Sequence, residues 1–209
     1  MSKYKGYCIA IVGTNGTGKS TFMKEIMDRY PSQKNVLLLM DDDSEEMFDY
    51  LTEITAEQIP YYRGQAVCFA GDSKKEKEFT FTQIYQGLGK DRNGKFNGAL
   101  LCIDDAMSIL TTRDDFVMRI FKKRRQRKMD IIINCHGASE YPISLFRNTT
   151  HFVVCKTTDS YDQITKRMNK ELAEDFVKVV NYVNKRAEEN PYFKMIFDLK
   201  NPKKLPENV

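Results

Sequence analysis

The sequence predicts an α/β fold, a three-layer α/β/α sandwich around one mostly parallel sheet. Two observations support this prediction. Apolar runs of strand length recur along the chain, as expected of strands that helices cover on both faces; they occupy residues 7–12, 36–40, 99–103, 129–136 and 151–155. Segments with apolar residues at helical spacing alternate with these runs, at residues 20–30, 113–128 and 171–188.

The remaining segments carry weaker signals. The charged stretch 74–78 is expected to be a solvated loop. Residues 192–199 alternate apolar and polar side chains, which indicates a half-exposed edge strand. No internal repeat or break in composition divides the chain, so residues 1–200 should form a single domain, followed by a loose tail at 201–209. Other short elements are expected at 44–63 (two short helices), 65–70 (a strand), 81–86 and 141–147 (both helical).

A glycine-rich loop follows the first apolar run and matches G-x-x-x-x-G-K-[ST]. Its flanks predict a strand and a helix, which is the context in which this motif binds phosphate. The glycines let successive N–H groups turn toward a phosphate, and the helix start adds the positive end of its dipole. Lys19 would contact the outer phosphates of ATP, and the Ser20 hydroxyl would ligate Mg²⁺. The loop comprises Gly13, Thr14, Asn15, Gly16, Thr17, Gly18, Lys19, Ser20 and Thr21.

Two acids, Asp104 and Asp105, end the apolar run 99–103. Such a strand downstream of a P-loop is a Walker B motif. Asp104 would hold Mg²⁺, and Asp105 would orient and deprotonate the attacking water. A strand and helices separate the two motifs, and the strand after Walker B ends in a polar residue. This arrangement is typical of motor-type P-loop NTPases of the RecA/ASCE type.

Two other polar segments allow alternative interpretations. The acids at 41–43 follow a strand, so they could lie near the nucleotide at the binding edge of the sheet. Alternatively, Asp43 caps the next helix with Glu46 at its third position, which we favour for Asp43 alone. The loop 87–98, with four glycines, is either a moving or binding loop or a plain connector.

Composition narrows the class of protein. Hydrophobic residues make up 41% and charged residues 30%, as in a soluble globular protein. No apolar run is long enough for a membrane span, and residues 1–6 leave no room for a signal peptide. A cytoplasmic location, or one inside a particle assembled there, is therefore expected. The five scattered cysteines lack a C-x-x-C pair and should be buried thiols, which argues against a zinc site.

The net charge of +4 depends on one local feature, because residues 122–128 include six basic side chains. Three explanations fit this cluster. Arg125 could enter a neighbouring subunit's site as an arginine finger. The cluster could grip DNA phosphates without sequence preference. It could also be an ordinary solvated helix end, where cations suit the dipole.

These motifs together resemble the FtsK–HerA superfamily of DNA-pumping ATPases. The likeness is strongest to small genome-packaging ATPases of membrane-containing viruses, and it extends to zonula-occludens-toxin-like phage assembly ATPases. It rests on the P-loop, on residues 100–106 and on residues 125–136. Phage assembly relatives usually continue into a membrane span, which this chain lacks, so packaging is favoured.

The resemblance implies roles for residues and partners. His136 would sense the γ-phosphate, and Arg125 would act as the finger between subunits. ATP, Mg²⁺ and sequence-independent DNA are the implied ligands. The implied assembly is a homo-oligomeric ring, a hexamer, which meets a capsid or portal-type protein. Three departures stand out: Asp105 replaces the usual Glu, His136 replaces the usual Gln, and Gln126 replaces the His that often follows the arginine.

Two other functional classes remain possible at this stage. Nucleotide and small-molecule kinases have a similar size and also begin with a P-loop, but they need a mobile arginine-rich lid. The arginines here adjoin a buried strand, which is poor geometry for a lid. A non-catalytic, nucleotide-binding component of a particle is the second alternative, because Asp105 is shorter than the usual Glu.

Overall fold

A sheet forms the centre of the molecule. The computed structural model describes residues 6–41, 46–89, 96–110 and 115–202. Within these residues, eight strands pair in the order β3-β4-β2-β5-β6-β1-β7-β8. Neighbours are parallel except β7 and β8, which are antiparallel. The strands are β1 (Cys8–Val12), β2 (Val36–Met40), β3 (Thr52–Glu53), β4 (Gln65–Phe69), β5 (Leu100–Ile103), β6 (Asp130–Cys135), β7 (His151–Val154) and β8 (Met195–Asp198).

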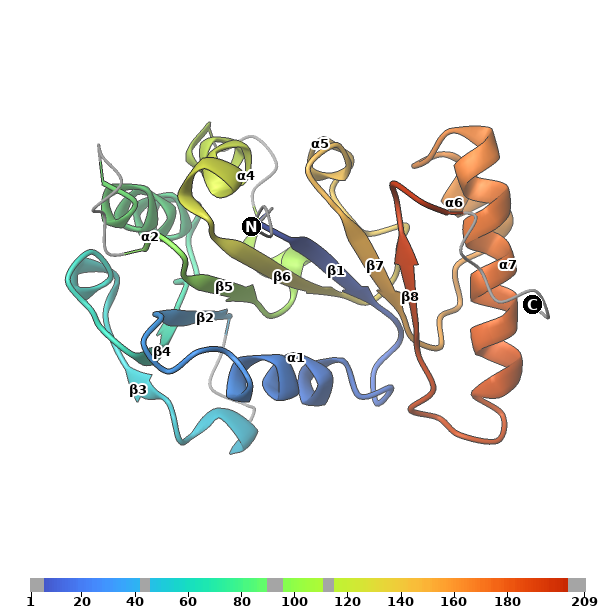
Figure 1. Ribbon diagram of the computed structural model, residues 1–209, viewed down its shortest axis with the longest axis horizontal. Helices are drawn as coiled ribbons and strands as arrows, with labels where there is room; N and C mark the ends of the chain where they lie inside the picture. Colours follow the sequence, from blue (N-terminus) through green and yellow to red (C-terminus); the bar gives the residue numbers. More distant parts are fainter. Residues whose placement is uncertain (1–5, 42–45, 90–95, 111–114, 203–209) are drawn as a thin grey trace, which may run out of the picture.

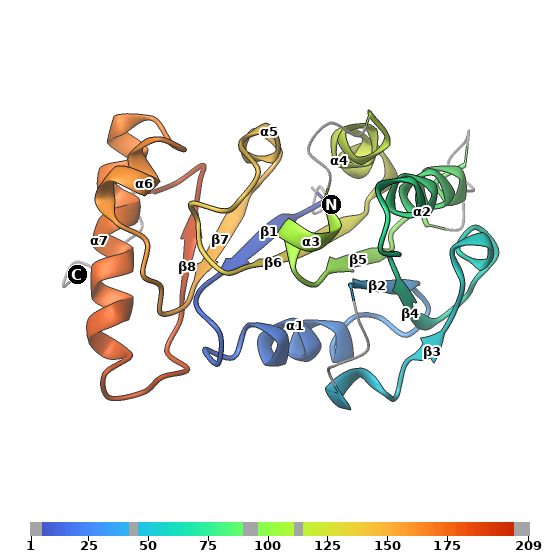
Figure 2. The same ribbon diagram turned by 180° about the vertical axis from the view of Figure 1, so that it is seen from behind.

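Helices cover both faces of this sheet. Helix α1 lies on one face, and α2 and α4 lie on the other, in both views (Figure 1 and Figure 2). Helix α7 packs beside β7 and β8. The predicted α/β/α fold is therefore confirmed. The helices are α1 (Lys19–Asp28), α2 (Lys74–Gly87), α3 (Ala106–Ile109), α4 (Asp115–Arg127), α5 (Ile143–Phe146), α6 (Tyr161–Thr165) and α7 (Lys170–Arg186), with 3-10 turns η1 (Glu46–Phe48) and η2 (Ala56–Gln58).

Strand β2 shows why the apolar runs are continuous. All five of its residues are buried. Leu37 and Leu39 belong to the core on the side of α2 and α4, whereas Leu38 belongs to the core with Met23 and Met27 of α1. A strand with a helical layer on each face needs apolar residues at every position.

The charged stretch 74–78 was expected to be a loop, and this expectation is wrong, because these residues form the first turns of α2. The cause is a capping box at Ser73 and Glu76. The backbone N–H of Ser73 donates to Glu76 Oε2 at 2.8 Å, and that of Glu76 donates to Ser73 Oγ at 3.3 Å. Two otherwise unpaired donors are thereby satisfied at the helix start.

Other differences are small. The two short helices expected in the segment 44–63 are the 3-10 helices η1 and η2, and the unpredicted short strand β3 lies between them. The short helices α3 and α6 were not predicted. The edge strand β8 is shorter than the predicted 192–199. Asp42, Asp43, residues 90–95 of the loop 87–98 and the tail from residue 203 lie outside the described residues.

Two expectations drawn from the composition, about the cysteines and about membrane-spanning segments, can be compared with the structure. All five cysteines are buried, free thiols, as predicted. Burial raises the pKa of the Cys8 thiol to about 11, and that of Cys68 to about 12, so these groups stay protonated. Across the described ranges, none of the helices combines the length and apolarity that crossing a bilayer requires.

Candidate active site

A cavity of about 320 Å³ lies where the carboxyl ends of several strands meet. The P-loop, the residues that follow β2 and β5, the end of β6 and helix α3 all line it. Lys19, Ser20, Asp104, Asp105 and His136 are among its lining residues, as is Asn15. The structure thus brings the predicted phosphate-binding, metal-binding and catalytic residues together, with Arg125 as the exception.

The P-loop conformation depends on its glycines. Gly16 and Gly18 have φ of 75° and 79°, in the left-handed region that residues with a Cβ rarely adopt. A Cβ on Gly13 would lie 2.6 Å from Cys155 Cβ, so this position also excludes a side chain. The Lys19 ammonium donates to the Thr14 carbonyl at 3.0 Å, and its side chain therefore folds back across the loop.

Neighbouring strands hold the loop in place. The Gly13 N–H donates to the Cys135 carbonyl at 3.2 Å, at the end of β6. The Thr14 N–H donates to the Lys156 carbonyl at 2.8 Å, just after β7. The Thr17 hydroxyl donates to the Thr14 carbonyl at 2.8 Å. Because both flanking strands anchor it, the loop is preorganised to receive a phosphate.

Asp104 lies directly after β5, beside the end of β6. The side-chain amide of Asn134, which is 2% exposed, donates to Asp104 Oδ1 at 2.6 Å. Burial raises the pKa of Asp104, and the nearby charge of Asp105 raises it further; the Asn134 amide, Lys19 and His136 act in the opposite direction. The carboxylate is thus held in one orientation, in surroundings that favour a cation beside it.

The donor set fits Mg²⁺. Asp104 contributes a carboxylate and Ser20 a hydroxyl, and both line the cavity beside Lys19. Mg²⁺ prefers such hard oxygen donors, and it usually takes one or two protein ligands together with phosphate oxygens and water. Asn134 Oδ1 is a further buried oxygen, without a hydrogen-bond partner among the described residues.

Asp105 has a strained backbone and a second structural role. Its φ of 52° is left-handed, and its carboxylate caps α3. It accepts the Met107 N–H at 3.1 Å and the Ser108 hydroxyl at 2.8 Å. His136 Nε2 lies 3.9 Å from Asp105 Oδ2. Aspartate is favoured over glutamate as a helix cap, which gives a physical reason for Asp105 in place of the usual Glu.

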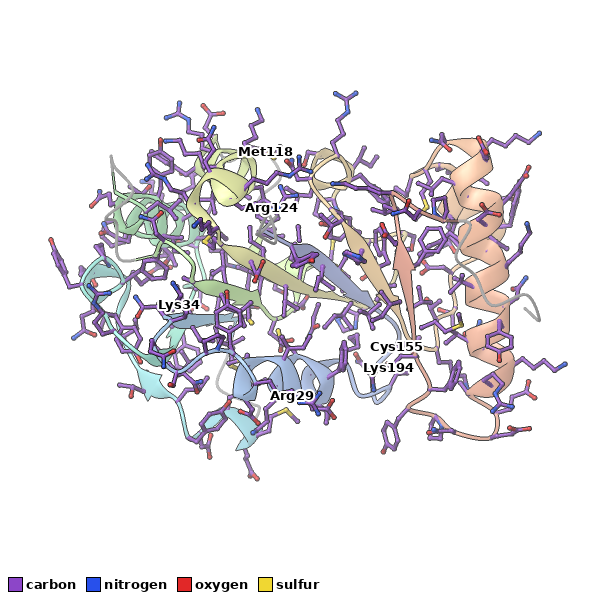
Figure 3. The ribbon with its side chains drawn as sticks, in the orientation of Figure 1. Arg29, Lys34, Met118, Arg124, Cys155 and Lys194 are labelled. Atoms are coloured by element: carbon purple, nitrogen blue, oxygen red, sulfur yellow. The ribbon has the colours of Figure 1, made fainter. Side chains whose placement is uncertain are left out.

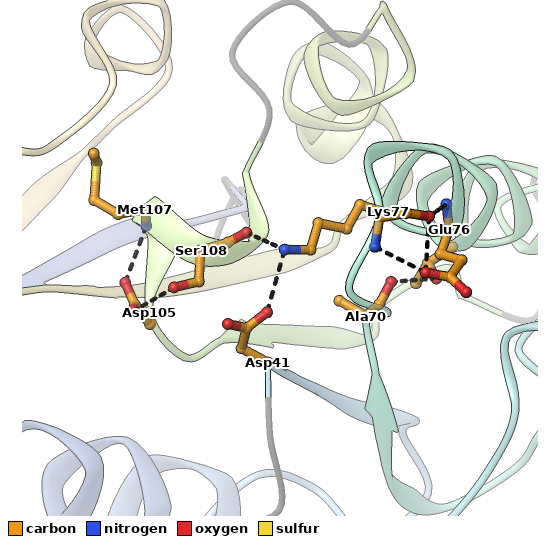
Figure 4. Close-up of polar contacts among 9 residues, drawn as sticks. Asp41, Ala70, Glu76, Lys77, Asp105, Met107 and Ser108 are labelled. Atoms are coloured by element: carbon orange, nitrogen blue, oxygen red, sulfur yellow. Dashed lines mark hydrogen bonds and ion pairs between the residues drawn. The ribbon is translucent and has the colours of Figure 1, made fainter.

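A lysine from α2 reaches this group of residues (Figure 4). The Lys77 ammonium donates to the Ser108 carbonyl at 2.7 Å and lies 3.3 Å from Asp41 Oδ1. Its side chain is only 12% exposed. Asp41 lines the cavity, so it lies at the edge of the sheet where the first interpretation of the acids after β2 placed it. Lys77 thereby connects α2, α3 and the end of β2.

Arg125 lies near the C-terminal end of α4, just before β6 begins. It is therefore at the amino ends of the parallel strands, opposite the carboxyl ends that form the cavity beside the P-loop. It lines a separate cavity of about 520 Å³ with Lys34, Arg127 and Lys128. Figure 3 shows the separation of the two sites: Lys34, which lines the cavity of Arg125, lies far from Cys155, which follows β7 beside the P-loop. Arg125 is exposed, whereas Arg124 is 2% exposed and points into the core. The chain therefore does not bring Arg125 to its own P-loop.

Three residues of the site were not assigned a role from the sequence. Lys77 fell in the charged stretch that was interpreted as a loop, and the S-x-x-E pattern at Ser73 would have revealed a helix there. Ser108 lies in the unpredicted helix α3. Asn134 was visible as a polar residue in an apolar run, but its pairing with Asp104 depends on β6 lying next to β5.

Comparisons with known proteins identify the family and the fold of this chain. A family model described as Poxvirus A32 protein matches residues 3–200. A search of curated proteins found no match to this chain. Among solved structures, the genome packaging NTPase B204 from Sulfolobus turreted icosahedral virus 2 in complex with AMPPCP has a TM-score of 0.71 and 15% identity, over 95% of this chain and 95% of that one.

Two further structures share the fold more distantly. VirB4 of Thermoanaerobacter pseudethanolicus has a TM-score of 0.58 and 11% identity, over 85% of each chain. The N-terminal domain of zonular occludens toxin from Neisseria meningitidis has a TM-score of 0.51 and 14% identity, over 97% of this chain and 100% of that one. The chain shares its fold with the genome packaging NTPase B204, so the predicted resemblance to packaging proteins is confirmed at the level of the fold. Because the family model covers nearly the whole sequence, the chain belongs to the Poxvirus A32 protein family.

Proposed function

We propose that this chain is an ATPase that drives viral DNA into a particle as a homo-oligomeric ring of six subunits. The observation that carries the proposal is the convergence of Lys19, Asp104 and Asp105 on one cavity at the carboxyl edge of the sheet. Membership of the Poxvirus A32 family and the shared fold of B204, a genome packaging NTPase solved with AMPPCP and with ATP-gammaS, support it.

The chain's own groups would bind and orient the triphosphate. The P-loop N–H groups and Lys19 would contact the β- and γ-phosphates, and Mg²⁺ bound by Ser20 and Asp104 would neutralise their charge. Asp105 would act as the general base, for which its carboxylate must exchange the Met107 N–H and the Ser108 hydroxyl for a water molecule. His136 lies close enough to Asp105 to donate to the γ-phosphate from the same side.

The position of Arg125 favours a site shared between subunits. It lies at the amino edge of the sheet, whereas the P-loop lies at the carboxyl edge. A head-to-tail ring is the symmetric arrangement that brings these two unlike edges together. Arg125 of one subunit would then contact the neighbour's γ-phosphate, and Lys34, Arg127 and Lys128 would add positive charge around it.

DNA would bind through its phosphates, without sequence preference, because the basic side chains are concentrated in the segment 122–128.

A packaging ring also needs a docking partner on the particle, and a capsid or portal-type protein is the expected class. Such an assembly would form in the host cytoplasm or in the virion.

A mixing experiment tests the shared site. Lys19→Ala should lose nucleotide binding but still supply its arginine, whereas Arg125→Ala should bind ATP without turning it over. Each variant alone should be inactive. An equal mixture should recover about a quarter of the wild-type rate, because one interface in four then combines an intact P-loop with an intact arginine.

Lys122→Ala is the matched control, since it removes an exposed cation of α4 that does not line the cavity. It should turn over ATP as the wild type does. Normal turnover by Arg125→Ala alone, or a mixture as inactive as its components, would contradict the shared site. Failure of the wild-type protein to hydrolyse ATP at any concentration, with DNA present, would support the non-catalytic alternative.

A further inference from the structure

The connection between α7 and β8 brings an aromatic side chain to the P-loop. Tyr192 lies in this connection, and a Cβ built on Gly18 would be 3.1 Å from Tyr192 Cδ1. The ring therefore packs directly on the backbone of the loop that would hold the phosphates. It is nevertheless 59% exposed, so much of its surface is open to a ligand.

The topology of the sheet sets the direction in which a nucleotide would lie. Asp104 directly follows β5 and Asn134 lies near the end of β6, and both strands are on one side of β1. They mark the end of the cavity that would take the γ-phosphate and Mg²⁺. Strands β7 and β8 lie on the other side of β1. A triphosphate that starts near Asp104 and follows the P-loop would therefore direct its ribose and base toward β7 and β8, where Tyr192 lies.

The connection is fixed in place before any ligand binds. Asn190 Oδ1 accepts the Tyr192 N–H at 3.1 Å, and the Asn190 carbonyl accepts the Phe193 N–H at 2.9 Å. The Phe193 ring packs edge-on against Tyr182 of α7, at a centroid distance of 5.8 Å. A side chain held on a rigid turn loses little entropy when it binds a ligand.

A lysine adds positive charge on the same side. The Lys194 ammonium lies 4.9 Å from the ring centroid of Phe22, in the first turn of α1. Lys194 lies beside Cys155 in Figure 3. Burial raises the pKa of the Cys155 thiol, while Lys194 and Lys19 both act to lower it, so both ammonium groups lie near this thiol.

We propose that Tyr192 forms the base-binding wall of the nucleotide site, where the purine of a nucleoside triphosphate stacks on its ring. Lys194 lies where it can face the α-phosphate or the ribose. This proposal rests on the proposed function, since it assumes a triphosphate in the P-loop, and it adds the residue that recognises the rest of the nucleotide. Stacking of a base on an aromatic ring is a stable contact that does not require a particular base.

The test compares a ligand that carries a nucleoside on its three phosphate groups with one that consists of the three phosphate groups alone. Calorimetry with Mg²⁺ would measure the Kd of AMPPCP and of inorganic tripolyphosphate. Tyr192→Ala should weaken AMPPCP binding about 10-fold, as expected for the loss of one base–aromatic stack, and should leave tripolyphosphate binding unchanged. Tyr192→Phe should bind both ligands as the wild type does, because it keeps the ring.

Tyr61→Ala is the control, since Tyr61 is 73% exposed and lies after η2, in the part of the chain near the other end of the sheet. An unchanged AMPPCP affinity in Tyr192→Ala would overturn the base-binding role. An equal loss for both ligands would also overturn it, because the change would then act through the shape of the P-loop. A wild-type protein that binds neither ligand would instead refute the proposed function, and the base wall with it.

Discussion

At the scale of single residues, the pair of Asp104 and Asn134 determines how the predicted metal-binding carboxylate is oriented. The Asn134 amide orients the carboxylate from a buried position on the adjacent strand. Burial and the charge of Asp105 nevertheless raise the pKa of Asp104. The ionised form is therefore less favourable in the folded protein than in the unfolded chain, and this group lowers stability at neutral pH. A bound cation would reverse that effect.

This linkage predicts the behaviour of Asp104→Asn. The variant should lose Mg²⁺-dependent turnover, yet without nucleotide its free energy of unfolding at about pH 7 should exceed that of the wild type. A raised carboxyl pKa costs stability only as the pH rises from the ordinary aspartate range through the raised value. The difference should therefore shrink as the pH falls toward about 4. Urea unfolding at several pH values measures it.

Asp105→Asn is the matched control for that measurement. Asparagine also caps helices and tolerates the left-handed backbone at this position, so the variant keeps the cap of α3. The loss of the Asp105 charge removes only the smaller of the two causes that raise the pKa of Asp104, so stability at about pH 7 should rise less than in Asp104→Asn. If Asp104→Asn were less stable than the wild type at about pH 7, the proposed cost of burying this carboxylate would be wrong.

At the scale of elements, α2 is the helix that connects the site to the rest of the sheet. Lys77 bonds the Ser108 carbonyl in α3, and Ser108 in turn donates to Asp105. The same ammonium pairs with Asp41 at the end of β2. A helix that carries no predicted catalytic residue thus helps to fix the position of Asp105, the proposed general base.

We therefore expect Lys77→Met to lower kcat about 10-fold with little change in the KM for ATP, because the loss of a supporting contact affects the base and not the P-loop. Steady-state kinetics measures both parameters. Lys74→Met is the control on the same helix, since its side chain is 68% exposed and pairs only with Glu78 among the described residues. A rise in KM without a change in kcat would assign Lys77 to substrate binding.

The same elements show how far the sequence could predict the molecule. The P-loop unit and the Walker B strand were predictable because their signals are local: glycines at fixed spacing, and apolar runs that end in acids. The start of α2 was missed because its charged residues outweighed the capping pattern at Ser73. The contacts of Lys77 and Asn134 join segments that are distant in the sequence, so they depend on the strand order, which no local pattern shows.

At the scale of the whole molecule, the two edges of the sheet differ in chemistry. The carboxyl edge holds the acids and the P-loop, and the amino edge holds a cavity lined by four cations, Lys34, Arg125, Arg127 and Lys128. One chain therefore presents two complementary surfaces that cannot meet within it. Heterologous contacts between such surfaces form a ring where the rotation between subunits closes, and the proposed assembly requires this closure.

If the proposed shared site is correct, turnover per subunit should rise steeply with protein concentration, because an isolated subunit would lack an arginine finger, which accelerates hydrolysis about 10³-fold or more. ATPase assays over a dilution series, together with sedimentation to find the assembled fraction, measure this. Arg125→Ala should bind AMPPCP normally and should show no such rise. A rate per subunit that is constant while assembly changes would contradict the shared site.

The most direct test is the structure of the assembled protein with Mg²⁺ and AMPPCP. We expect the β- and γ-phosphates within hydrogen-bond distance of Lys19 Nζ, with Asp104 on the metal side and the neighbour's Arg125 guanidinium at the γ-phosphate. A triphosphate bound outside residues 13–21, or a neighbouring subunit that presents no cation to it, would contradict a nucleotide site shared between subunits.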